Sequence, residues 1–151
     1  MNSDSNPVRL YATHAWTEDD DYQRLFEFLE SARGFTYRNL SRPEACPRTG
    51  REAEQSALRS QIDPAEIVLV LAGQYAASPF LIDYQANCAR GLRKPVLLLS
   101  IFGGAAPPAP SLAAAANEVV DWNERALVDA IRRLTRRATR PRYATIDFTP
   151  D

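Results

Sequence analysis

The residue types that most often carry chemistry are scarce in this sequence. Its 151 residues include one histidine (His14), one lysine (Lys94) and two cysteines (Cys46 and Cys88). The spacing of the cysteines and the histidine matches no zinc site, and Lys94 precedes Pro95 instead of closing a Gly-Lys-Ser/Thr phosphate loop. Catalysis by two histidines is excluded. Enzyme chemistry here would depend on carboxylates, amides, backbone groups and the single imidazole.

Polar and aromatic residues instead follow three apolar segments of the chain. They are His14 and Trp16 after the first segment, Asn39 and Ser41 after the second, and Gly73, Tyr75 and Ser78 after the third. Each of them also has a simpler interpretation. The histidine could be a hydrogen-bonded scaffold residue and the tryptophan could pack, while asparagine and serine are common in turns. No one of these residues alone defines a site.

Strands and helices alternate along the chain and would position these residues. The alternating pattern over 7–13 and the continuous apolar runs over 67–71 and 95–101 are typical of strands, the last two buried on both faces. We expect strands over residues 7–13, 35–37, 67–71, 95–101 and 118–121. We expect helices from the acidic residues 19–21 to Gly34, over 53–62, 79–90 and 126–134, and a short alanine-rich segment after residue 110.

This alternation predicts an α/β protein with an open, parallel five-stranded sheet in three layers. In a flavodoxin-like strand order, ligands bind outside the carboxyl ends of the strands, in the crevice between the first and third strands. The loops expected to form that crevice cover residues 13–19, 39–50, 72–80 and 102–110.

Three common occupants of this fold lack their signatures. A phosphoacceptor receiver needs an aspartate after the third strand, where this chain has Ala72 and Gly73. A flavin mononucleotide site needs a glycine-containing loop after the first strand, and residues 13–16 contain no glycine. The six glycines never show the G-x-G-x-x-G spacing of a dinucleotide-binding fold.

Eight short segments occur along the chain in a characteristic order. They are THAW at 13–16, DDYQRL at 20–25, NLSRP at 39–43, QIDP at 61–64, VLAGQYA at 70–76, KP at 94–95, FG at 102–103 and VDWN at 120–123. In this order they resemble the small prokaryotic TIR-like domains that are the signalling enzymes of Thoeris antiphage systems. The resemblance implies a TIR-like domain over residues 7–138, between a flexible N-terminus (1–6) and a C-terminal tail (139–151).

The resemblance implies a chemistry and a set of site residues. The family cleaves the nicotinamide–ribose bond of NAD and makes an ADP-ribose-derived, cyclic signal nucleotide that activates a partner effector. NAD is the substrate, and no further cofactor or metal is implied. The catalytic position, a glutamate in the family, corresponds to Gln85. The residues implied to bind the substrate are Thr13, His14, Trp16, Asn39, Ser41, Gly73, Tyr75 and Phe102, although core packing is the favoured role for Phe102.

Gln85 departs from the family pattern at the residue that matters most. Bond cleavage develops positive charge on the ribose, which a carboxylate stabilises and an amide does not. Asp83 should point from a different helix face, so it does not replace the carboxylate. The chain is therefore interpreted as an inactivated or substrate-trapping form of an NAD-cleaving enzyme. The alternatives are a TIR-type nucleotide-binding or interaction module without catalysis, and a nucleoside-processing transferase.

The net charge, the cysteine content and the length of the apolar runs allow predictions about the cellular location and the partners of the protein. No signal peptide pattern opens the chain, and no apolar run approaches the roughly 20 residues of a membrane span, so we expect a cytoplasmic protein with reduced thiols. The net charge of −1 argues against general nucleic-acid binding.

The C-terminal part of the chain departs from this charge balance. Residues 132–142 hold six arginines, interpreted as a solvated helix face or as a contact with nucleic acid or protein. Apolar and polar residues alternate over 143–148. This pattern is typical of an extra strand or of a contact with a neighbouring subunit, so a homo-oligomer is an open alternative.

Overall fold

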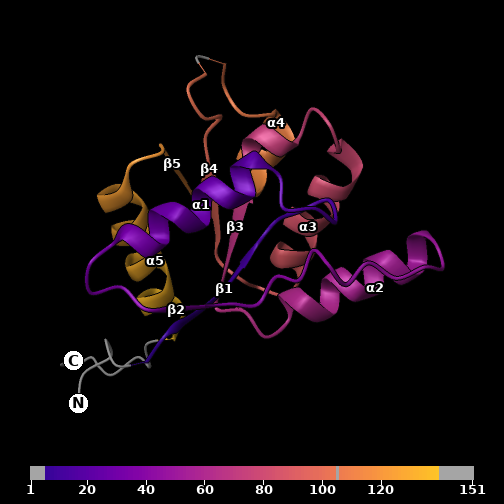
Figure 1. Ribbon diagram of the computed structural model, residues 1–151, viewed down its shortest axis with the longest axis horizontal. Helices are drawn as coiled ribbons and strands as arrows, with labels where there is room; N and C mark the ends of the chain where they lie inside the picture. The colour runs from indigo at the N-terminus through magenta and orange to yellow at the C-terminus, as the bar shows by residue number, and fades with distance from the viewer. Residues whose placement is uncertain (1–5, 105, 140–151) are drawn as a thin grey trace.

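The computed structural model describes residues 6–104 and 106–139, and it has one five-stranded parallel sheet covered by helices on both faces (Figure 1). The strand order is β2-β1-β3-β4-β5. The strands are β1 (Val8–Ala12), β2 (Tyr37–Asn39), β3 (Ile67–Leu71), β4 (Val96–Leu99) and β5 (Glu118–Val120). The predicted three-layer, flavodoxin-like α/β fold is confirmed.

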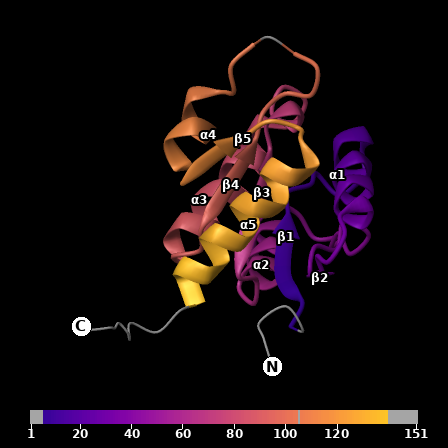
Figure 2. The same ribbon diagram turned by 90° about the vertical axis from the view of Figure 1, so that its left-hand side faces the viewer.

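The helices form two layers, one on each face of the sheet. They are α1 (Asp20–Ser31), α2 (Arg51–Ile62), α3 (Pro79–Gly91), α4 (Pro110–Ala115) and α5 (Glu124–Thr139), and a 3₁₀ turn, η2 (Ala72–Gln74), follows β3. Apolar residues of α1 and α5 pack on one face, and those of α2, α3 and α4 pack on the other. Figure 2 shows α1 on one side of the sheet, with α3 and α4 on the opposite side.

The central strands hold the two layers together because both of their faces are apolar. Every residue of β3 and β4 is buried, with no exposed surface. Alternate residues therefore enter opposite cores: Leu69 and Leu71 contact the α1 and α5 side, while Val68 and Val70 contact the α2 and α3 side. This burial on two faces is what the uninterrupted apolar runs predicted.

One predicted strand is displaced. We expected the second strand over residues 35–37, but β2 begins at Tyr37, which pairs with Val8, and ends at Asn39. Phe35 is buried in the core on the α1 side, so it packs as an anchor before the strand instead of joining the ladder. Asn39 is therefore the last residue of β2 and does not follow it.

Some expectations lie outside the described residues. These are the flexible N-terminus over residues 1–5, the tail beyond residue 139, and the extra strand or subunit contact over 143–148. Within the described part of the chain, no helix combines the length and the apolar character that crossing a membrane requires.

Candidate functional site

The carboxyl ends of β1 and β3 meet at the place where the strand order reverses. The two strands are neighbours, with Leu10 paired to Ile67 and Ala12 paired to Leu69. The chain leaves β1 through Thr13 and His14, and it leaves β3 through η2. Since ligands of open α/β sheets bind at such reversals, this edge is the candidate site.

Gln85 joins helix α3 to the loop after β1. Its side chain has no exposed surface. Its Oε1 accepts hydrogen bonds from the Tyr11 hydroxyl at 2.6 Å and from the His14 N–H at 3.1 Å. Its Nε2 donates to the carbonyls of His14 at 2.8 Å and Leu81 at 3.0 Å. The side-chain amide of Gln85 matches these partners because its oxygen faces two hydrogen-bond donors and its nitrogen faces two acceptors.

Gln74 makes a parallel connection from η2, which the sequence did not single out. Its Oε1 accepts from the Thr13 hydroxyl at 2.8 Å, and its Nε2 donates to the Thr13 carbonyl at 3.0 Å and to Asp19 Oδ1 at 3.3 Å. Thr13 Oγ1 also accepts from the Leu71 N–H at 3.1 Å. Two buried glutamines thus hold the consecutive residues Thr13 and His14. The only sequence signal was the position of Gln74 directly after Gly73.

His14 links the loop after β1 to the loop after β2. Its Nδ1 accepts from the Trp16 N–H at 3.1 Å, so the neutral ring carries its proton on Nε2 and donates to Gln61 Oε1 at 3.1 Å. Gln61 Oε1 also accepts a hydrogen bond from the Arg42 backbone N–H, and Gln61 Nε2 donates to the Arg42 carbonyl. The imidazole is fully buried, and this burial lowers the pKa of His14.

Because of His14, the free energy of unfolding is expected to decrease as the pH is lowered below about 6.5, the usual imidazole pKa. The lowered pKa of His14 in the folded state means that the unfolded chain takes up a proton first. Unfolding then becomes easier as the pH decreases, by at most about 1.4 kcal/mol per pH unit. Urea unfolding at pH 7.5 and 5.5 measures the change, with His14→Asn as the variant without a titrating ring.

His14 is the only histidine in the sequence, so the comparison isolates its effect. The His14→Asn protein should lose less stability over this interval than the unchanged protein. An equal loss in both proteins would show that carboxyl groups, and not the imidazole, cause the pH dependence.

Trp16 is the strained residue of the loop after β1. Its φ angle is 66°, a left-handed conformation that few residues other than glycine adopt. Its ring meets His14 edge-on with centroids 4.9 Å apart. Its indole Nε1 is buried and has no hydrogen-bond partner among the described residues. A ligand acceptor or a shift of this loop would satisfy that donor.

Asn39 and Ser41 belong to a second network, centred on Tyr22. The Asn39 amide donates to the Tyr22 hydroxyl at 2.9 Å, and this hydroxyl lies 2.9 Å from Ser41 Oγ. Ser41 donates to Asn39 Oδ1 through both its N–H, at 3.0 Å, and its hydroxyl. The structure therefore brings these two predicted residues together, in a cluster separate from Gln85.

Tyr75 lies toward α4 and does not join the Gln85 network. Its hydroxyl donates to Asp83 Oδ2 at 2.8 Å, and Ser111 donates to Asp83 Oδ1 at 2.7 Å. Asp83 thus points from a different face of α3 than Gln85, as expected.

A partly exposed carboxylate, Asp21, lies against Gly73 on η2. A Cβ at Gly73 would lie 2.1 Å from Asp21 Oδ2, so the absence of a side chain makes room for the carboxylate. Asp21 Oδ1 accepts from Arg24 Nη1 at 2.7 Å. Burial raises the pKa of Asp21, and the neighbouring Arg24 charge opposes this rise. Sequence analysis treated residues 19–21 only as a helix start.

Phe102 completes this part of the edge. The Arg24 guanidinium lies 3.8 Å above the Phe102 ring, and the ring is 46% exposed. Core packing, the role favoured for Phe102 from the sequence, is therefore wrong. Phe102 also contacts Trp122 edge-on with centroids 5.7 Å apart.

Fold and geometry define an α/β domain of flavodoxin-like arrangement with a polar site at the reversal between β1 and β3. No protein-family model matches the sequence, and the comparison with curated proteins finds no match. The function must therefore be inferred from the site itself together with the motif resemblance.

Proposed function

We propose that this protein is a TIR-like domain that binds NAD at the edge between β1 and β3, and that Gln85 limits cleavage of its nicotinamide–ribose bond. The observation that carries the proposal is the position of Gln85, buried beneath the loop after β1 at the reversal of strand order. The motif segments 13–16, 39–43 and 70–76 lie on the loops around the same edge.

Three groups at this edge suit the parts of a dinucleotide. The Asp21 carboxylate can accept hydrogen bonds from ribose hydroxyls, and guanidinium groups such as that of Arg24 favour phosphate oxygens. The exposed Phe102 ring offers a stacking surface for a base. Each group is partly exposed, whereas Gln74 and Gln85 are buried.

The chemistry proposed for this chain is binding with slow cleavage. Departure of nicotinamide leaves positive charge on the ribose, and a neutral amide at position 85 stabilises that charge poorly. A carboxylate there would support formation of an ADP-ribose-derived, cyclic signal nucleotide. In this proposal the protein acts in the cytoplasm of a phage-defence system, and the nucleotide connects it to an effector protein.

Asp21→Asn is expected to weaken NAD binding about tenfold, since a hydrogen bond to a charged group contributes about 1.5–3 kcal/mol. ADP-ribose, which keeps the same riboses and phosphates, should show the same loss. Isothermal titration calorimetry of the folded proteins measures both affinities. Asp129→Asn is the matched control, because Asp129 is an exposed carboxylate on α5.

The two functional alternatives predict different results from this titration. If the Asp21→Asn and Asp129→Asn proteins bound NAD with equal affinity, Asp21 would not belong to the binding site. A folded protein that binds neither NAD nor ADP-ribose would contradict the proposal and favour the non-catalytic interaction module.

A further inference from the structure

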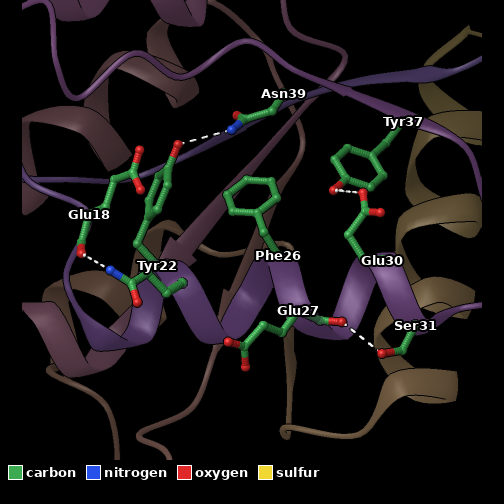
Figure 3. Close-up of a pocket in the computed structure, with 9 residues that line it drawn as sticks. Glu18, Tyr22, Phe26, Glu27, Glu30, Ser31, Tyr37 and Asn39 are labelled. Atoms are coloured by element: carbon green, nitrogen blue, oxygen red, sulfur yellow. Dashed lines mark hydrogen bonds between the residues drawn. The ribbon is translucent and has the colours of Figure 1, made fainter.

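A pocket of about 670 Å³ lies between α1 and the edge strand β2 (Figure 3). Tyr22 and Phe26 of α1 and Tyr37 of β2 help to line it. On the same helix, Asp21 and Arg24 instead contact Gly73 and Phe102. Helix α1 therefore separates this pocket from the candidate NAD site.

Three aromatic rings form the apolar surface of the pocket. The ring centroids of Tyr22 and Phe26 are 4.9 Å apart, and those of Phe26 and Tyr37 are 5.8 Å apart. Figure 3 shows Phe26 between the two tyrosines, with all three rings on the side of α1 that faces β2. Of the three, Phe26 and Tyr37 are partly exposed and Tyr22 is buried. Exposed ring faces attract cations and also cover methylene groups.

The charge of the pocket is entirely negative. Its nine lining residues include Glu18, Glu27 and Glu30, and none of the nine is lysine, arginine or histidine. Among the side chains that the structure describes, those of residues 6–104 and 106–135, none forms an ion pair with these three carboxylates. The pocket is therefore unsuited to the phosphates of a nucleotide and suited to a cation.

The carboxylates lie at two separate positions along the pocket. Glu18 precedes α1, and Glu27 and Glu30 lie one turn apart near its end. At 1.5 Å per residue, the helix rises about 15 Å from Asp20 to Glu30, and Glu18 lies before the helix begins. Phe26 lies between these positions (Figure 3). A ligand that reaches both must be long, with separated positive charges and an apolar middle.

The remaining polar groups of the pocket already have partners. The Asn39 amide donates to Tyr22, the Tyr37 hydroxyl donates to Glu30 at 2.6 Å, and the Gln23 amide donates to the Glu18 carbonyl at 2.8 Å. What these groups leave available is chiefly carboxylate acceptors. An ammonium chain has only donors, whereas a peptide also carries carbonyls that would need donors here.

We propose that this pocket binds a linear aliphatic polyamine. One ammonium group lies against Glu18 and another against Glu30, and the methylene chain crosses the ring of Phe26. Glu27, whose side chain extends from the other side of α1 in Figure 3, adds negative charge at the rim of the pocket. This ligand class matches the charge, the length and the unused hydrogen-bonding capacity of the pocket. The proposal goes beyond NAD binding and does not depend on it.

Spermidine is the probe for the test, with binding followed by isothermal titration calorimetry at low ionic strength. The double variant Glu27→Gln with Glu30→Gln is expected to bind spermidine about tenfold more weakly, as the loss of one ion pair and of a second nearby negative charge implies. Phe26→Leu keeps an apolar side chain but removes the ring, and should weaken binding about twofold to fivefold. Glu52→Gln with Glu124→Gln changes the net charge equally at exposed positions and should leave the affinity unchanged.

Three results would overturn the proposal. The first is that spermidine does not bind the unmodified protein, and the second is that the control pair loses as much affinity as the pocket pair. The third is that a lysine-containing peptide of equal charge binds and spermidine does not. Urea unfolding of each variant shows whether it is folded. Titration of the Glu27→Gln with Glu30→Gln variant with NAD tests whether the two sites are separate, because its affinity for NAD should not change.

Discussion

Gln85→Glu is expected to raise the rate of nicotinamide release from NAD by about 10²–10³-fold, the effect of gaining one preorganised electrostatic partner. The introduced carboxylate would face the carbonyl oxygens of His14 and Leu81, to which Gln85 now donates. Those oxygens repel a charge on the nearer carboxylate oxygen, whereas the Tyr11 hydroxyl and the His14 N–H, which donate to Gln85 Oε1, would stabilise a charge on the other one. Chromatography of nicotinamide at saturating NAD measures the rate.

Gln74→Glu is the matched control for this experiment. Gln74 is also buried, and it also donates to a carbonyl of the loop after β1, that of Thr13. Because Gln74 lies on η2 and not on α3, its replacement should not accelerate release. Equal rates for the Gln85→Glu variant and the unmodified protein, with both folded and binding NAD, would contradict the catalytic role of position 85. Fast release by the unmodified chain would contradict it as well.

Gln85→Leu is expected to lower the free energy of unfolding by about 3–5 kcal/mol, since each buried polar group left without a partner costs about 1–3 kcal/mol. The leucine would have a similar volume but no polar atoms. It would leave the Tyr11 hydroxyl and both backbone groups of His14 without their partner. Urea denaturation followed by circular dichroism measures the loss.

Gln23→Leu provides the comparison for this measurement. Gln23 is exposed on α1 and makes one side-chain hydrogen bond, to the Glu18 carbonyl. Its replacement should change stability by no more than about 0.5 kcal/mol, as is usual for surface positions. If the Gln85 and Gln23 variants were equally stable, the network around Gln85 would contribute little to the fold. Its glutamine would then have to be explained by function alone.

The fold could be predicted from the sequence because its signals are local. The uninterrupted apolar runs at 67–71 and 95–101 indicated strands buried on both faces, and the helical spacing between them indicated crossovers. The second strand was misplaced because the apolar Phe35 reads as part of a strand. Only its contact with the core shows that it lies before the ladder.

The site could be predicted in part for the same reason. Loops that follow parallel strands share one edge of the sheet, so Thr13, His14 and Gly73 could be assigned to it before any geometry was known. The sequence could not show that Asn39 and Ser41 bind Tyr22, or that Phe102 is exposed beneath Arg24. These facts depend on which side of a helix or loop each side chain occupies after packing.

By itself, the sequence determined that this protein has a parallel α/β sheet, that its candidate site follows β1 and β3, and that it holds glutamine where the resemblance expects glutamate. Only the tertiary structure decided how that glutamine is used. Gln85 reaches residues 71 and 74 positions away, Gln74 reaches Thr13 across 61 positions, and Asp21 fits against Gly73. Such contacts depend on three-dimensional packing between distant segments, which no local pattern of residues encodes.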